Sequence, residues 1–336
     1  MTRVTVLGGG SWGTTLALVL HDNGHRVTVW EFDADQVAAV RRDGENEKFL
    51  PGVRLPESIR FTDDLESSVD DAEALVFAVP SHVTRSVAQR VSELVESDTP
   101  VINVSKGIEN ETLMRMSEVL SAELGRSDAH AISSLVGPSH AEEVSRRLPT
   151  TVVAGALEEA TAVITRELFM TEYLRVYTNT DLVGVELGVS LKNVIAIAAG
   201  ICDGLGYGDN TKGALLTRGL AEMTRLGVAM GGRAETFAGL SGMGDLITTC
   251  ISKHSRNRFV GEAIAEGRSL QDILDSMVMV AEGVRTTRSV AGLSRKLGVE
   301  MPICEQMNLV LFDGKPPREA IADLMLRDPR PEHVET

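Results

Sequence analysis

The sequence has 336 residues, 43% of them hydrophobic, and a formal net charge of −15 at pH 7. At about 150 residues a domain, this length indicates about two domains, and the acidity argues against a nucleic-acid partner, because phosphate backbones need clustered Lys and Arg. No apolar run approaches the ~20 residues of a membrane span, and the chain enters a strand without a signal peptide. The three cysteines lack metal-ligand spacing. We therefore expect a cytoplasmic protein with no membrane partner and no metal.

The first predicted element is a strand that leads through a glycine-rich turn into a helix. A β-rich run at residues 4–7 precedes Gly8-x-Gly10-x-x-Gly13, and a helical pattern continues to residue 20. In dinucleotide-binding domains these glycines allow a tight turn, the approach of a pyrophosphate and close packing of helix on strand, and the helix N-terminus offers its N–H groups to the phosphates. The alternative is an ordinary glycine-rich turn in another doubly wound domain.

Strands and helices alternate along the first half of the chain. Besides the opening unit, we expect strands at residues 25–30, 74–79, 100–104, 131–136, 151–154 and 174–178, helices at 34–42, 84–95, 112–124 and 158–169, and a long irregular connection at 44–64. Such alternation predicts an α/β domain with a doubly wound sheet.

The second half shows mainly helical periodicity. Helices are predicted at residues 181–202, 212–230, 256–266, 269–275, 283–297 and 301–311. We place the domain boundary near Gly188, inside or beside the first of these helices. The prediction is therefore a Rossmann domain at residues 1–187 and an all-helical domain at residues 188–330.

Lys192 is the only long side chain on a stripe of small residues in the first helix of the second domain. Gly184, Gly188, Ala196 and Gly200 share its line at a spacing of four, so another backbone can pack closely against them. A snorkelling surface lysine is the alternative interpretation. If Lys192 is buried instead, its pKa should fall, which suits proton transfer near neutral pH.

Two further stretches carry polar groups that suit a small anionic substrate. In the glycine-rich stretch at residues 239–250, Asp245 is expected either to hold a lysine ammonium or to cap a helix. Ser255, Arg256 and Asn257 open a predicted helix. A helix N-terminus with a hydroxyl, a guanidinium and an amide describes an anion site, although a solvated basic turn would have the same residues.

Six segments together resemble the NAD(P)-dependent glycerol-3-phosphate dehydrogenases of the cytoplasmic type. They occur in the family's order at residues 8–14, 104–107, 137–139, 186–193, 242–246 and 255–257. The Leu-Lys-Asn, Gly-Asp-Leu and Ser-Arg-Asn motifs are the specific ones, and they favour the functional interpretation of Asp245 and of residues 255–257. The resemblance implies a fold like that of 6-phosphogluconate dehydrogenase. It also implies reversible NAD(P)H-dependent reduction of dihydroxyacetone phosphate to sn-glycerol 3-phosphate, which feeds glycerophospholipid synthesis.

The same resemblance implies roles for individual residues. Lys192 would transfer the proton, as acid in reduction and base in oxidation, and Asp245 would orient it or the substrate hydroxyl. Substrate contacts are implied at Lys106, Gly137, Ser139, Lys192, Asp245, Ser255, Arg256 and Asn257. Cofactor contacts are implied at Gly8, Gly10, Ser11, Trp12, Gly13, Phe32, Lys106, Ala141, Arg256, Val280 and Glu282.

The acidic stretch after the second strand bears on the choice of cofactor. Glu31 and Asp33 stand where a basic or imidazole side chain would welcome the 2′-phosphate of NADP. Carboxylates repel that phosphate and accept ribose hydroxyls, so we expect NAD to be favoured over NADP. Arg41 or Arg42 would be the only nearby cation able to offset this repulsion.

Other activities are compatible with the same motifs. A β-hydroxyacid or 6-phosphogluconate-type dehydrogenase would also place a lysine on a long helix after a Rossmann domain. A non-catalytic dinucleotide sensor would need the glycines but no proton donor. We expect a small-molecule substrate, and the all-helical domain offers a surface for a possible homodimer.

Overall fold

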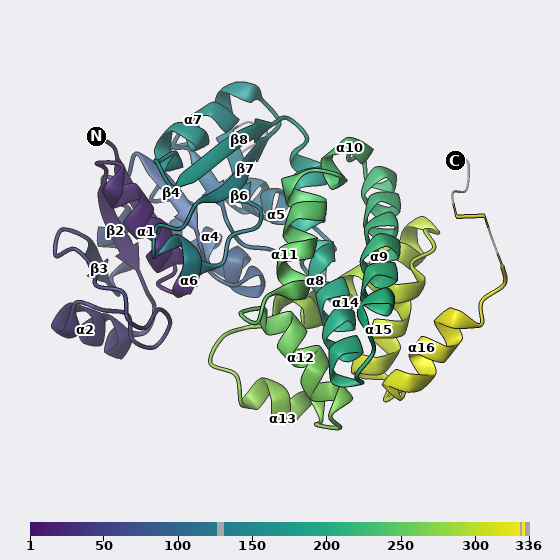
Figure 1. Ribbon diagram of the computed structural model, residues 1–336. Coiled ribbons are helices and arrows are strands. Elements are labelled where there is room, and N and C mark those ends of the chain that lie inside the picture. The colour runs from purple at the N-terminus through teal and green to yellow at the C-terminus, as the bar shows by residue number, and fades with distance from the viewer. Residues whose placement is uncertain (126–130, 330, 333–336) are drawn as a thin grey trace.

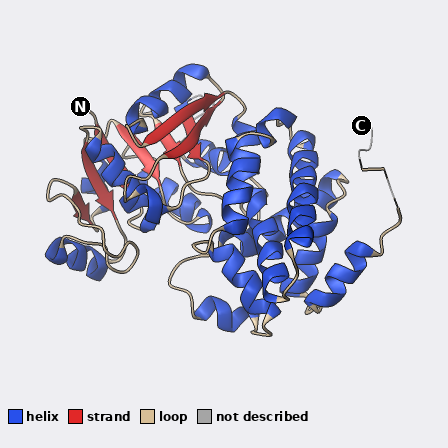
Figure 2. Cartoon of the chain, viewed as in Figure 1, coloured by secondary structure: helices blue, strands red, loops and turns tan. Residues whose placement is uncertain are grey.

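The computed structural model describes residues 1–125, 131–329 and 331–332 (Figure 1). The strands lie together at one side of the molecule, and the helices that follow them in the chain form a second body beside them (Figure 2). The fold is therefore a Rossmann-type sheet domain followed by a helical region, as the sequence predicts. Residue 330, the last of the predicted second domain, lies outside the described residues.

One sheet of eight strands forms the first body, in the order β3-β2-β1-β4-β5-β6-β7-β8. Its strands are β1 (Arg3–Leu7), β2 (Arg26–Trp30), β3 (Arg60–Thr62), β4 (Ala74–Phe77), β5 (Val101–Asn103), β6 (Ile132–Val136), β7 (Thr150–Ala156) and β8 (Leu174–Asn179). Neighbours run parallel except β6 and β7. At the centre, Val6 of β1 pairs in register with Val29 of β2 and Val76 of β4. The carboxyl ends of β1, β2, β4, β5 and β6 therefore share one edge.

Helices cover both faces of this sheet. They are α1 (Ser11–Asp22), α2 (Ala34–Asp43), α3 (Leu65–Val69), α4 (Thr84–Val91), α5 (Met116–Glu123), α6 (Ala141–Val144) and α7 (Glu159–Phe169). One apolar cluster joins α1, α2 and α7 to the sheet, and a second joins α3, α4 and α5. A doubly wound sheet buries its strands on both faces in this way, which explains the continuous apolar run at β4.

The predicted irregular connection at residues 44–64 is wrong at its end, because it contains β3. This strand has three residues and pairs only with β2 at the sheet edge. So short a run has no periodicity to detect. The short helices α3 and α6 were also absent from the prediction for the same reason.

The second body is helical and is organised around α8 (Leu182–Gly204). The others are α9 (Asp209–Ala229), α10 (Ala234–Phe237), a π-turn η3 (Leu240–Gly244), α11 (Asp245–Ile251), α12 (Arg256–Ala265), α13 (Leu270–Asp275), α14 (Glu282–Leu297), α15 (Pro302–Phe312) and α16 (Pro317–Met325). The sequence did not predict α10, α11 or α16. Gly188 lies within α8, which runs across it without a break, and the domain boundary near this residue stays a prediction.

The small residues of α8 let neighbouring backbones come close, as predicted. A Cβ on Gly188 would lie 2.7 Å from the carbonyl oxygen of Ser241 in η3. A Cβ on Gly200 would overlap the carbonyl of Arg258 in α12. The closely packed helix is therefore held at fixed positions against the two elements that flank the candidate site.

The expectation that no segment matches a membrane span is wrong for α8. Its best window has a mean hydropathy of 1.7 and is long and apolar enough by composition. Glu186 and Lys192 interrupt the apolar run in sequence, which is why the pattern did not show it. Because 94% of the window is buried within the protein, α8 is accounted for as a core helix.

Candidate active site

A cleft of about 780 Å³ lies between the sheet and the helical body. Its lining includes most of the predicted site residues: Gly8, Gly10, Ser11, Trp12, Glu31, Phe32, Asp33, Lys106, Ser139, Ala141, Lys192, Asp245, Ser255, Arg256, Asn257, Val280 and Glu282. Gly13 and Gly137 are not part of this lining. The carbonyl of Gly137 accepts a hydrogen bond from Lys106 Nζ at 3.0 Å. Residues distant in the sequence thus converge on one cavity.

The glycine-rich turn after β1 fits a dinucleotide. Gly8 has φ +115°, and a Cβ there would lie 2.9 Å from the backbone of Ala78. A Cβ on Gly13 would overlap the carbonyl of Gly8, so helix and strand need both glycines. Gly10 has no atom within 4 Å of a Cβ position and lines the cleft at the N-terminus of α1. Open backbone at a helix N-terminus is what a pyrophosphate requires.

The carboxylates after β2 are both engaged by the protein. Glu31 is buried, and its Oε2 accepts a hydrogen bond from Gly9 N at 2.9 Å. Asp33 caps α2 by accepting from Gln36 N at 3.2 Å, and this hydrogen bond is the main cause of its lowered pKa. Phe32 between them is 79% exposed. Negative charge is therefore fixed at this end of the cleft.

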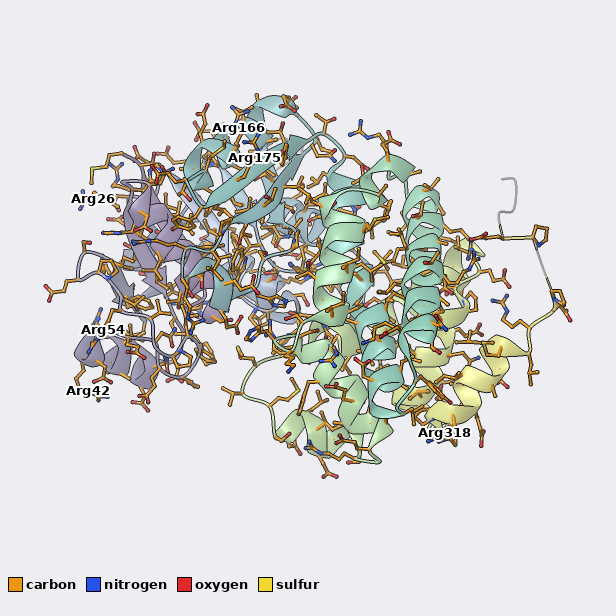
Figure 3. The ribbon with its side chains drawn as sticks, viewed as in Figure 1. Arg26, Arg42, Arg54, Arg166, Arg175 and Arg318 are labelled. Carbon is orange, nitrogen blue, oxygen red and sulfur yellow. The ribbon has the colours of Figure 1, made fainter. Side chains whose placement is uncertain are left out.

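The cation nearest these carboxylates is Lys48, and the expectation that Arg41 or Arg42 would hold this place is wrong. Lys48 Nζ lies 3.3 Å from Asp33 Oδ2, and the residue lines the cleft. Arg41 donates to the carbonyl of Phe61. Arg42 pairs with its neighbour Asp43 and lies at the outer edge of the molecule, as Figure 3 shows.

Three charged side chains meet at the centre of the cleft. Lys106 Nζ lies 2.9 Å and Lys192 Nζ 3.2 Å from the same oxygen, Oδ2 of Asp245. Lys106 follows β5, Lys192 belongs to α8, and Asp245 is the first residue of α11. Both bodies of the protein therefore contribute a lysine to one carboxylate.

The electrostatics of this cluster lower the pKa of Lys192. Burial lowers it to about 8, the nearby Asp245 carboxylate opposes this shift, and the charge of Lys106 adds to it. Burial by itself would raise the pKa of Asp245, but the two ammonium groups outweigh burial and lower it. Lys192 is thus the buried lysine expected from its stripe, and it can exchange a proton near neutral pH.

Asp245 does not serve as a helix N-cap. The cap position of α11 is Gly244, the last residue of the π-turn, which is in helical conformation, and the carboxylate of Asp245 is directed to the lysines. Its Oδ1 accepts a hydrogen bond from Thr249 Oγ1 at 3.2 Å, and Thr249 also accepts from Lys192 Nζ. Sequence reasoning missed Thr249, because its i, i+4 relation to Asp245 becomes visible only once α11 is known.

The start of α12 brings a guanidinium to the cleft. Ser255 caps the helix by accepting from Arg258 N at 3.2 Å. Asn257 donates to Asn193 Oδ1 and accepts from Gly283 N, each at 2.9 Å. Over residues 1–125 and 131–329, Arg256 has no ion-pair partner within 4.0 Å. Its charge is therefore available to an anion.

Glu282 joins the two bodies through Ser81. Its carboxylate accepts from Ser81 N at 2.9 Å and from Ser81 Oγ at 2.6 Å. Three histidines that the sequence left unassigned, His82, His140 and His254, also line the cleft, and the ring centroids of His140 and His254 are 5.8 Å apart. Burial, then Lys192, lowers the pKa of His140. Among the described residues no group of three or more His, Cys, Asp and Glu is arranged for a metal ion.

Comparison with known proteins relates both halves of the chain to one family. Family models described as NAD-dependent glycerol-3-phosphate dehydrogenase N-terminus and C-terminus match residues 3–162 and 181–322. A glycerol-3-phosphate dehydrogenase of Agathobacter rectalis, with NAD(P)+ given as its cofactor, is 50% identical over 99% of this chain and 98% of its own length. One from Geobacillus thermodenitrificans is 52% identical over 99% and 97%.

Solved structures show the same similarity. The glycerol-3-phosphate dehydrogenase of Coxiella burnetii is 36% identical and superposes with a TM-score of 0.92, covering 97% of this chain and 99% of that one. The Saccharomyces cerevisiae protein is 26% identical with a TM-score of 0.81, covering 97% and 99%. A ketopantoate reductase of Ralstonia eutropha, at 14% identity and TM-score 0.59, shares the fold.

Proposed function

This chain belongs to the NAD-dependent glycerol-3-phosphate dehydrogenase family, and from that membership we propose how its cleft performs the reaction. The activity is NAD(P)-dependent oxidoreduction at a secondary CH–OH group, between glycerol 3-phosphate and dihydroxyacetone phosphate. When bound, the nicotinamide cofactor supplies or accepts the hydride. The chain's own residues must then bind both reactants, transfer one proton to or from the substrate oxygen, and neutralise the charge of the substrate phosphate.

The turn between β1 and α1 would hold the cofactor. Gly10, Ser11 and Trp12 present backbone N–H groups at the start of α1, where a pyrophosphate gains from the helix dipole. Phe32, Ala141 and Val280 line the same part of the cleft, and Glu282 lies where it joins the two bodies. The open backbone at Gly10 is the observation that supports this assignment.

Lys192 would carry the proton. In reduction its ammonium donates a proton to the ketone oxygen as that oxygen gains negative charge, and in oxidation the neutral amine takes the hydroxyl proton back. A buried amine with a pKa of about 8 can do both. Asp245 would orient Lys192, and Lys106 would face the substrate oxygen from the other side. The shared contact of the two lysines with Asp245 carries this proposal.

The start of α12 would bind the substrate phosphate. Arg256 would supply the charge, while Ser255 and Asn257 shape the turn and the first helical N–H groups add to the field. Ser139, whose hydroxyl donates to the carbonyl of Gly137 at 3.0 Å, would contact the substrate from the sheet side.

The cofactor preference follows from the charges after β2. We propose that NAD is favoured, because Glu31 and Asp33 repel a 2′-phosphate. Lys48 offsets this repulsion only in part, since it is exposed and already paired with Asp33, and solvent screens such exposed pairs.

Several broader features are also part of the proposal. The net charge of −15 and the buried state of α8 support a cytoplasmic protein that needs no nucleic acid and no membrane. A homodimer, and a boundary that divides residues 1–187 from 188–330, stay predictions.

One assay tests the function directly. Purified protein should oxidise NADH in the presence of dihydroxyacetone phosphate, followed by nicotinamide absorbance, and should reduce NAD in the presence of glycerol 3-phosphate. The control substrates are 3-hydroxy acids and 6-phosphogluconate, which should give no more than background. Turnover of a control substrate in place of glycerol 3-phosphate would contradict the proposal.

A further inference from the structure

Asn103 is a buried amide at the end of β5, two residues before the turn that carries Lys106. It is 1% exposed, and its Oδ1 accepts from Ser105 N at 3.1 Å. Its Nδ2 donates to the carbonyl oxygen of Ser105 at 3.1 Å. The Asn103 side chain thus supplies a hydrogen-bond partner to both backbone groups of Ser105.

The other side of this amide faces a buried carboxylate on α8. Asn103 Nδ2 lies 3.3 Å from Ser134 Oγ and 3.5 Å from Oε1 of Glu186. Glu186 is 4% exposed and accepts from Ser134 Oγ at 2.9 Å. With acceptors on one side of the amide and the Ser105 N–H on the other, its orientation is fixed.

Glu186 is itself held firmly. Its carboxylate accepts from Arg115 at 2.8 Å, from Ser117 N at 3.0 Å and from Ser117 Oγ at 2.6 Å. A buried carboxylate keeps its place when charge and hydrogen bonds compensate its lost hydration. The anchor for Asn103 is therefore rigid, and it belongs to the helix that also carries Lys192.

The same helix contacts the Lys106 turn a second time. Ser190, one helical turn after Glu186, donates to the carbonyl of Gly107 at 3.3 Å. Both neighbours of Lys106 are thus connected to α8. Ser105 is connected through the Asn103 side chain, and Gly107 through Ser190. The distance between the two lysines is set by these contacts as well as by Asp245.

We propose that Asn103 is a positioning residue for the reaction, which holds the turn at residues 105–107 against Glu186 of α8 and so fixes where Lys106 meets Asp245 beside Lys192. This inference rests on the proposed role of Lys192. No part of the proposed mechanism needs Asn103 to touch substrate or cofactor.

The consequence appears in the titration of Lys192, because Lys106 is one of the charges that face it. The titratable groups around Lys192 are Asp245 and Cys250 of α11, Lys106 after β5 and His140 before α6. If Lys106 moves away, Lys192 loses a repelling charge and keeps more of the attraction of Asp245. Both changes raise its pKa, so oxidation, which needs the neutral amine, should require a higher pH.

The test compares Asn103→Ala with Ser133→Ala. Ser133 is buried on the neighbouring strand β6 and shares a 2.6 Å hydrogen bond with Thr165, so its variant loses a buried hydrogen bond in the same sheet without touching the Lys106 turn. For Asn103→Ala we expect kcat of glycerol 3-phosphate oxidation to fall about tenfold or more. We expect the acidic limb of its pH profile to move up by about half a pH unit or more. Ser133→Ala should leave the limb unchanged.

An unshifted limb in Asn103→Ala, or an equal shift in Ser133→Ala, would overturn the inference. If Asn103→Ala does not fold, the milder Asn103→Ser takes its place, because its single hydroxyl cannot satisfy both backbone groups of Ser105. For this variant too, an unshifted limb, or an equal shift in Ser133→Ala, would overturn the inference. Failure of the proposed function is separate: it would appear as retained activity in Lys192→Ala, whatever the Asn103 variants do.

Discussion

The ammonium groups of Lys106 and Lys192 meet at a single atom, Oδ2 of Asp245, at 2.9 and 3.2 Å. One carboxylate compensates two cations, so one of them is held in its charged form less firmly than an ordinary ion pair would hold it. Lys192 is the more buried, with 5% of its side chain exposed against 20% for Lys106. This difference in burial supports the proposal that Lys192, rather than Lys106, exchanges its proton.

Replacing Lys192 by Ala should abolish most of the turnover. General acid–base catalysis contributes about 10²–10⁴-fold, and we expect kcat to fall within that range. NADH binding, measured by fluorescence titration, should change little, because the turn proposed to hold the pyrophosphate lies between β1 and α1 and does not include Lys192. Lys315→Ala, which removes a lysine that pairs with Asp323 on the helical body's outer side, is the control and should keep its activity. Retention of most activity by Lys192→Ala would exclude its role.

The pH dependence of the wild-type enzyme should differ between the two directions. Oxidation needs neutral Lys192, so its kcat should rise with pH and level off above the pKa of about 8. Reduction needs the ammonium, so its kcat should fall as the pH passes the same value. Opposite limbs near one pKa in initial-rate profiles would support the assignment, whereas identical profiles would contradict it.

Replacing Asp33 by Asn should weaken the preference for NAD. Asparagine can still cap α2, but one repelling charge is lost and Lys48 is released toward the cleft. Because solvent screens the charges of exposed groups, the NADPH to NADH ratio of kcat/KM should rise by no more than about fivefold. Asp43→Asn, which frees Arg42 outside the cleft, should leave the ratio as in the wild type. A fall in the ratio for Asp33→Asn would count against the charge argument.

Gly188→Ala should damage both stability and activity. Its Cβ would lie 2.7 Å from the carbonyl oxygen of Ser241, and the turn that follows leads to Asp245. Overpacking of this kind costs about 1–3 kcal/mol. Gly213 lies in α9 with no atom within 4 Å of a Cβ position, so Gly213→Ala should instead raise stability by up to about 1 kcal/mol. Urea unfolding of both variants measures the contrast, and equal effects would show that the close approach is not a constraint.

Glu222 should make stability depend on pH. It is 3% exposed, and burial raises its pKa to about 7, although it accepts hydrogen bonds from Ile303 N and Cys304 N. Because the folded state holds this proton more firmly than the unfolded state, the free energy of unfolding should decrease as the pH rises from the unfolded pKa through about 7. Relative to Glu222→Gln, the wild type should lose up to about 3 kcal/mol over this range. Parallel pH curves for the two proteins would contradict the shift.

The sequence predicted elements that have their own periodicity, and the structure confirms them. The run that became β4 and the small-residue stripe of α8 are local patterns, and they were interpreted correctly. In contrast, α11 lies in a glycine-rich stretch with no periodicity, so the position of Asp245 at its first residue was not predictable. The sequence does not predict β3 either, because a strand of three residues is too short to show periodicity.

The parts of the site that the sequence missed depend on contacts between distant residues. Lys106 and Asp245 are 139 positions apart, and only the folded chain brings a second lysine to that carboxylate. Lys48 belongs to an irregular connection, where no pattern indicates that it turns back to Asp33. Residue types were thus informative about chemistry, while the pairing of charges required the tertiary fold.

The burial of α8 separates what can vary in this protein from what cannot. The proposed nucleotide contacts lie largely on turns and loops at the sheet edge, which substitutions can reshape without disturbing the interior. Lys192 is instead built into the central helix, with close neighbours on every side. Over evolutionary time the choice of electron carrier can change in such a scaffold, whereas moving the lysine proposed as the acid would require repacking the whole helical body.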